Sequence, residues 1–160
     1  MKTFKAFILG LVGASSVAGA EVEMKYYSSA GDVFEVQAPA DWQQNANSDY
    51  LSISSPDGSV SITATAYSKN GGSLEEFAEY RFSSVQDFYT PQTAVRSIES
   101  GVLREYEGVW LGESAPTYYV VAAVEVGAAF VSITVVTDRK DYGENKPMYI
   151  KIFEAIKVNS

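Results

Sequence analysis

Residues 59–66 alternate between polar and apolar side chains at every position, and this pattern constrains the fold more than any other in the chain. A period of two places successive side chains on opposite faces of a β-strand. The polar members are Ser59, Ser61, Thr63 and Thr65, and the apolar members are Val60, Ile62, Ala64 and Ala66. A strand with one wet face is typical of an antiparallel sheet, so we expect such a sheet here.

The turn sequence Pro56-Asp57-Gly58 precedes this strand. Proline presets φ for a turn, and glycine accepts a positive φ. Residues 50–54 also alternate, so the two runs predict a β-hairpin around this turn. Residues 117–126 and 128–137 are long β-branched and aromatic runs joined at Val126-Gly127, and they predict a second hairpin. We expect this second hairpin to supply the central strands.

Shorter runs of the same kind predict the other strands. These runs are residues 33–37, 94–98 and 102–107, with residues 108–112 as a continuation between two glycines. The first run is expected to end at Pro39, and Gly101 is expected to form a bulge or bend between two strands.

Two segments predict helices. The first covers residues 73–89 and opens with a capping box, in which the Ser73 hydroxyl accepts the N–H of Glu76 and the Glu76 carboxylate accepts that of Ser73. Its stripe comprises Leu74, Phe77, Ala78, Arg81, Val85 and Phe88, apolar except at Arg81. After a polar loop at residues 138–146, Pro147 is expected to begin a closing helix over residues 147–157. Together these elements predict an α+β fold, an antiparallel β-sheet with helices packed on its faces.

The first twenty residues have the pattern of a signal peptide. Lys2 and Lys5 form a positive start, residues 7–14 are apolar, and Ala18-Gly19-Ala20 has the small-x-small pattern of a cleavage site. The apolar run is shorter than the ~20 residues of a membrane span, and no cysteine could carry a lipid anchor. We therefore expect a periplasmic or secreted protein, with residues 1–20 as a leader and residues 21–160 as one domain.

Several of these segments, in this order, resemble the PsbP-like superfamily. The resemblance is carried by Phe34-Glu35-Val36-Gln37-Ala38-Pro39-Ala40-Asp41-Trp42 with its Pro-x-x-Trp, by Ser54-Ser55-Pro56-Asp57-Gly58, by Ser73-Leu74-Glu75-Glu76 and by Ile152-Phe153. The superfamily includes the PsbP subunit of photosystem II, bacterial DcrB-type envelope proteins and a eukaryotic Ran-binding import factor. The resemblance covers about residues 32–158 and implies an α/β/α sandwich whose members mostly bind proteins or support assemblies.

The composition excludes several kinds of chemistry. The chain has no histidine and no cysteine, so it cannot form a Ser-His-Asp triad or use a thiolate. Its formal charge of −8, which removal of the two leader lysines makes more negative, disfavours binding to nucleic acid. The segment Gly112-Glu113-Ser114-Ala115-Pro116 begins like a nucleophile elbow, but Pro116 replaces the second glycine, and we interpret it as a turn.

The remaining candidates for catalysis are carboxylate pairs. A glycosidase uses two carboxylates about 5–10 Å apart, one of them with a raised pKa. Glu105 and Glu107 share one strand face, and Glu75 and Glu79 share one helix face. We interpret both pairs as solvated surface, and we expect a protein that is not an enzyme and carries no cofactor.

Asp138, Asp141 and Glu144 are the weak candidate for a metal site. They fall in one expected loop with Gly143, and carboxylate oxygens suit calcium. Their spacing does not match an EF-hand loop, and Arg139 and Lys140 offset their field. An ordinary solvated loop is therefore the preferred interpretation, and no metal is expected.

The tryptophans are the last candidates. Trp42, beside Pro39, is interpreted as a core residue. Trp110 lies between Gly108 and Gly112 and near Tyr106, and it admits two interpretations. It either packs in the core or lies on an exposed rim, where Tyr106 and Trp110 would bind a partner.

These observations favour an exported, non-catalytic binding or accessory protein of the cell envelope that acts through protein–protein contacts. The expected partner is an envelope protein or assembly. One alternative is a small-molecule or lipid-binding periplasmic protein, which would have a concave, mostly apolar pocket. The other is a carboxylate-dependent hydrolase, which would have carboxylates of strongly shifted pKa in a cleft.

Overall fold

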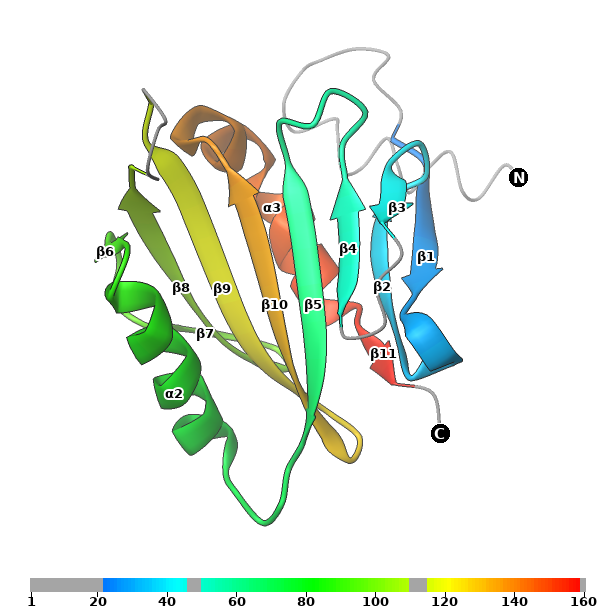
Figure 1. Ribbon diagram of the computed structural model, residues 1–160, viewed down its shortest axis with the longest axis vertical. Coiled ribbons are helices and arrows are strands. Elements are labelled where there is room, and N and C mark those ends of the chain that lie inside the picture. The colour runs from blue at the N-terminus through cyan, green and yellow to red at the C-terminus, as the bar shows by residue number, and fades with distance from the viewer. Residues whose placement is uncertain (1–21, 46–49, 110–114, 159–160) are drawn as a thin grey trace.

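A large antiparallel sheet organises the protein, whose computed structural model describes residues 22–45, 50–109 and 115–158. Its strand order is β3-β4-β5-β10-β9-β8-β6, and β7 also pairs with β8 (Figure 1). The strands are β3 (Gln43–Asn45), β4 (Leu51–Ser54), β5 (Ser61–Ser68), β6 (Thr90–Pro91), β7 (Arg96–Ile98), β8 (Gly101–Gly108), β9 (Thr117–Val126) and β10 (Ala129–Thr137). Both expected hairpins are confirmed, β4–β5 and β9–β10, and the second occupies the middle of the sheet.

A small sheet lies beside the large one. It consists of β1 (Met24–Ser28), β2 (Phe34–Pro39) and β11 (Lys157–Val158), in the order β1-β2-β11, with a 3-10 turn, η2 (Ala30–Asp32), between β1 and β2. The strand expected at residues 33–37 therefore runs to Pro39, which pairs with Met24. Pro39 is compatible with this strand because it lies at its end.

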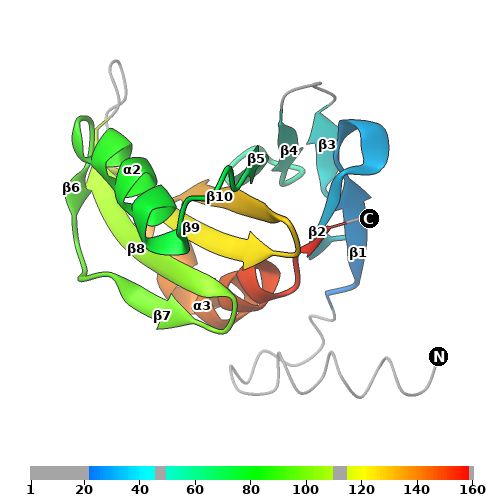
Figure 2. The same ribbon diagram turned by 90° about the horizontal axis from the view of Figure 1, so that it is seen from below.

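Helices α2 (Leu74–Gln86) and α3 (Arg139–Glu154) lie on opposite faces of the large sheet (Figure 2). On one face α2 buries Ala78, Phe82 and Val85 against Tyr106, Val121 and Ala123. On the other face α3 contributes Tyr142, Tyr149, Ile152 and Phe153 to a larger core with Val120, Ala122, Val124 and Ile133. The α+β fold expected from the sequence is confirmed.

The capping box of α2 is formed as expected. The Ser73 hydroxyl accepts a hydrogen bond from the N–H of Glu76 at 3.2 Å, and the Glu76 carboxylate accepts that of Ser73 at 2.9 Å. The apolar stripe expected on this helix is wrong at its end, because α2 ends at Gln86 and Phe88 lies beyond it, 70% exposed. Phe82, which the expected stripe did not include, is buried.

The expected polar loop at residues 138–146 is wrong, because α3 begins at Arg139 rather than at Pro147. Asp138 is the N-cap, and its carboxylate accepts the N–H of Asp141 at 2.7 Å. Tyr142 is 2% exposed, and burying its ring helps to hold the first half of the helix against the sheet. Pro147 lies inside the helix rather than in its first turn, and it has no N–H to donate to the carbonyl of Gly143.

Gly101 allows a close approach between neighbouring strands. A Cβ at this position would lie 2.1 Å from the carbonyl oxygen of Ala123 and 2.8 Å from the Cα of Val124. The residue begins β8 and pairs with Ile98, so it closes the β7–β8 hairpin against β9. This position therefore requires glycine for lack of space.

We expect Gly101→Ala to lower the free energy of unfolding by about 2–3 kcal/mol, because the strands must separate to admit the methyl group. Gly143→Ala is the matched control, since a Cβ there meets nothing within 4 Å and the residue lies inside α3. The control should raise stability by about 0.5–1 kcal/mol through helix propensity. Urea unfolding measures both, and equal effects of the two substitutions would contradict the packing argument.

Candidate functional site

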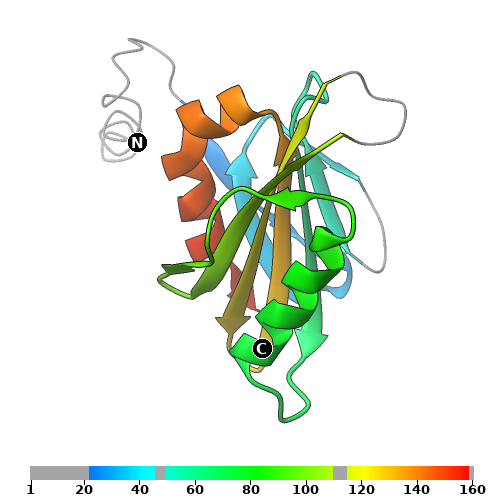
Figure 3. The ribbon, with the colours of Figure 1, turned by 90° about the vertical axis from the view of Figure 1, so that its left-hand side faces the viewer.

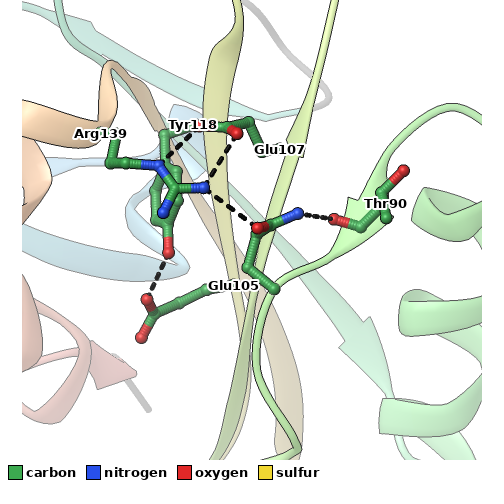
Figure 4. Close-up of polar contacts among 6 residues, drawn as sticks. Thr90, Glu105, Glu107, Tyr118 and Arg139 are labelled. Atoms are coloured by element: carbon green, nitrogen blue, oxygen red, sulfur yellow. Dashed lines mark hydrogen bonds and ion pairs between the residues drawn. The ribbon is translucent and has the colours of Figure 1, made fainter.

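A polar cluster occupies the end of the large sheet where β8, β9 and α3 meet (Figure 4). Glu105 and Glu107 alternate along β8 with buried Tyr106, so both face the α3 side of the sheet. Tyr118 lies opposite Glu107 on β9. Arg139 reaches the same place from the first turn of α3.

Glu105 is a buried carboxylate with three donors. It is 5% exposed and accepts hydrogen bonds from the hydroxyl of Tyr118 at 2.6 Å and that of Tyr142 at 3.4 Å. The Nζ of Lys146 lies 3.0 Å away and supplies the compensating charge. The interpretation of Glu105 as solvated surface is therefore wrong. The sequence could not show this burial, because Tyr142 and Lys146 belong to the part of α3 expected as a loop.

Glu107 forms a two-point ion pair with Arg139. The Nε and Nη2 of Arg139 each lie 2.9 Å from a carboxylate oxygen, and Nη2 also donates to the side-chain oxygen of Gln92 at 3.0 Å. The Arg139 guanidinium beside Glu107 holds the pKa of that carboxyl below its usual range. Gln92 donates in turn to the carbonyl of Thr90 at 3.1 Å (Figure 4), so the network connects α3 to the β6 edge.

Three stacked tyrosines, Tyr118 on β9 and Tyr142 and Tyr149 on α3, fill the space between the sheet and the helix beside this cluster. The rings of Tyr118 and Tyr142 lie 5.2 Å apart, and those of Tyr142 and Tyr149 lie 5.7 Å apart. Burial raises the pKa of all three phenols, and the neighbouring carboxylates Glu105 and Asp141 raise it further. The phenols therefore remain neutral hydrogen-bond donors at physiological pH, which suits them to satisfy buried carboxylates rather than to act as nucleophiles.

The candidate cation residues do not form a ligand set. Asp138 caps α3, and the side chain of Asp141 accepts from Thr137 at 2.8 Å, from Asn145 at 2.9 Å and from Tyr149 at 2.5 Å. Glu144 is exposed on the same helix. Within the described residues, no group of three or more histidine, cysteine or acidic side chains is placed to hold a metal ion.

Of the two candidate partner-binding residues, Tyr106 and Trp110, the structure describes only Tyr106. Tyr106 is fully buried, its ring 6.5 Å from that of Phe82, so the exposed position expected for it on a rim is not observed. Its place on β8 facing α2 explains this burial. Trp110 lies outside the described residues. Trp42 is half-buried and packs against the larger core, as expected.

Two exposed apolar side chains lie beside the polar cluster. Phe88 is 70% exposed and Val109 is 62% exposed. Thr90 pairs with Glu107 and Pro91 with Tyr106, so the segment that precedes β6 runs beside the end of β8. A Cβ on Gly108 would lie only 3.2 Å from the carbonyl oxygen of Phe88, which supports this juxtaposition. We call Phe88 and Val109 the apolar pair. No pattern in the sequence predicts this pair, because Phe88 fits the spacing of the apolar stripe expected on α2.

The fold was compared with known structures. The solution structure of cyanobacterial PsbP (CyanoP) from Synechocystis sp. PCC 6803 superposes with a TM-score of 0.60 at 11% identity, over 90% of this chain and 98% of that one. This chain has the PsbP-like fold. No protein-family model and no curated protein matches the sequence.

Other solved structures share this PsbP-like fold at similarly low identity. The Ran-binding protein Mog1p of Saccharomyces cerevisiae has a TM-score of 0.56 at 9% identity, covering 86% of this chain and 96% of that one. LpqN, involved in cell envelope biogenesis of Mycobacterium tuberculosis, has a TM-score of 0.51 at 10% identity, covering 92% and 96%. A Bacteroides thetaiotaomicron structure has a TM-score of 0.60 at 11% identity over 85% of this chain, which spans only 48% of that protein.

These similarities show the fold alone, and they are compatible with an accessory or binding protein. Among the described residues, neither α2 nor α3 combines the length and apolar character that a membrane crossing requires.

We expect Tyr118→Phe to lower the free energy of unfolding by about 1.5–3 kcal/mol, because it removes a short hydrogen bond to the buried Glu105 carboxylate. Tyr80→Phe removes a hydroxyl from a side chain that is 62% exposed, and it should change stability by less than about 0.5 kcal/mol. Urea unfolding at neutral pH compares the two. A Tyr118→Phe variant as stable as the control would contradict the assigned role of the cluster.

Stability should also fall steeply as the pH rises above 10.0, the ordinary pKa of tyrosine. Folding raises the pKa of Tyr118, Tyr142 and Tyr149, so the unfolded chain loses these protons first and is favoured at high pH. Their contribution is fully present below pH 10.0 and is lost as the pH rises towards the folded-state values. Urea unfolding across this range, with phenolate absorbance as a second readout, tests the expectation. Phenolates that all titrate at the ordinary pKa in the folded protein would contradict it.

Proposed function

We propose that the chain is an exported, non-catalytic accessory protein of the cell envelope that binds another protein through the apolar pair. The observation that carries this proposal is the exposure of Phe88 and Val109 at one end of the sheet, where the backbone of Phe88 lies beside Gly108, the neighbour of Val109. Exposed apolar side chains rimmed by polar groups are typical of protein–protein contacts. The Arg139–Glu107 ion pair supplies such a rim on β8 and α3.

Three further observations support the proposal. The carboxylates of the polar cluster are all engaged by donors, which favours a structural role for them over acid–base catalysis. Residues 1–20 have the pattern of a signal peptide, which supports export. Among proteins of similar fold, Mog1p is Ran-binding and LpqN is involved in cell envelope biogenesis.

The small-molecule or lipid carrier receives less support. Such a protein needs a concave, mostly apolar pocket, commonly between a sheet and a helix. Here the space between the sheet and α3 is filled by the stacked rings of Tyr118, Tyr142 and Tyr149 together with buried aliphatic side chains.

We expect Phe88→Ser to weaken partner binding by about 2 kcal/mol, roughly thirtyfold, as loss of a central aromatic contact does. The measurement is a crosslinking capture from the native envelope, with captured proteins quantified by mass spectrometry. Val33→Ser is the matched control, because Val33 is 48% exposed at the start of β2, away from the apolar pair.

The proposal expects one protein that is retained by the wild type and by Val33→Ser and lost by Phe88→Ser. Urea unfolding first establishes that the three proteins are equally stable. Equal capture by all three proteins would contradict binding at the apolar pair. A co-purifying lipid in place of a protein would favour the carrier.

A further inference from the structure

The outward face of α2 carries a shallow depression. Glu76, Glu79, Tyr80, Ser83, Ser84 and Asp87 line it, over an open volume of about 520 Å³. These positions recur every three or four residues and are solvent-exposed or half-buried, so they form one continuous stripe along the helix. The helix itself lies on the outside of the sheet (Figure 3). We call this the α2 stripe. Phe88 follows Asp87, the last residue of the stripe, in the chain.

The α2 stripe is strongly acidic. Three of its six residues are carboxylates and none is basic. Arg81, the basic residue of α2, donates to the hydroxyl of Ser132 on the sheet at 3.0 Å and is thereby directed away from the stripe. Glu76 is occupied by the capping box, but in the described part of the chain no ion pair engages Glu79 or Asp87. Negative charge is therefore left uncompensated on an exposed surface.

The arrangement suits an extended basic segment better than a single ion. The stripe runs from Glu76 to Asp87, which at 1.5 Å per residue is about 16 Å. Over the described residues no three acidic side chains gather closely enough to hold a metal ion, so the charges are spread along the helix. Tyr80, 62% exposed in the middle of the stripe, offers a ring for apolar and cation–π contact with lysine or arginine.

Resting on the proposed function, we infer that the partner protein presents a lysine- or arginine-containing segment that lies along the α2 stripe, with its apolar portion at Phe88. Charge complementarity would speed the encounter and fix the orientation of the segment. The apolar pair would provide the desolvated contact at its end.

The test measures fluorescence anisotropy of a short labelled peptide in which lysine and leucine alternate. A peptide with glutamate in place of lysine is the probe control. We expect the lysine peptide to bind and the glutamate peptide not to bind. The affinity for the lysine peptide should fall as the salt concentration is raised. The double variant Glu79→Gln/Asp87→Asn should weaken binding about fivefold, because it removes the two carboxylates left unpaired on the stripe. Tyr80→Ser should weaken it further.

The matched control is Glu23→Gln/Glu144→Gln, which removes the same charge from exposed positions outside the stripe. It should change the dissociation constant by less than about twofold. Equal weakening by both double variants would overturn the inference, because binding would then follow net charge alone. Failure of the lysine peptide to bind would also overturn it. If the lysine peptide does not bind but Phe88→Ser still loses the envelope partner, the inference fails and the proposed function stands. The failure of one can therefore be distinguished from the failure of the other.

Discussion

The burial of β9 on both of its faces is the constraint on which the rest of the structure depends. Residues Val120 to Val124 are completely inaccessible to solvent, with Val120, Ala122 and Val124 in one core and Val121 and Ala123 in the other. A strand buried on both sides must be covered by a helix on each face. The placement of α2 and α3 on opposite sides of the sheet follows.

The same constraint explains the polar cluster. Tyr118 lies at the start of β9, at the end of the sheet where α3 begins and where the buried core borders on solvent. A carboxylate buried at such a boundary is destabilising unless donors and an opposite charge surround it. Glu105 receives both from Tyr118, Tyr142 and Lys146, so an element distant in sequence closes this end of the core. The cluster therefore has a structural role at this end of the core.

The sequence predicted the elements whose causes are local. The β4–β5 hairpin follows from alternation and a turn sequence, and the start of α2 follows from a capping box that its own residues form. The first half of α3 was missed because its burial depends on Tyr142 packing against β9, which no local pattern contains. Glu105 was misinterpreted for the same reason. Phe88 fitted the helical spacing, but the helix ends two residues earlier and leaves it exposed.

The residues that stabilise the fold and those proposed for recognition therefore lie on different parts of the molecule. The side chains that hold α2 to the sheet, Ala78, Phe82 and Val85, face inward, whereas the α2 stripe faces water and contributes little to the core. Like charges along an exposed helix face destabilise it by only a few tenths of a kcal/mol per pair. The burial of the two cores on opposite faces of the sheet outweighs this small destabilisation. An acidic surface beside an exposed phenylalanine can thus be maintained for binding without endangering the fold.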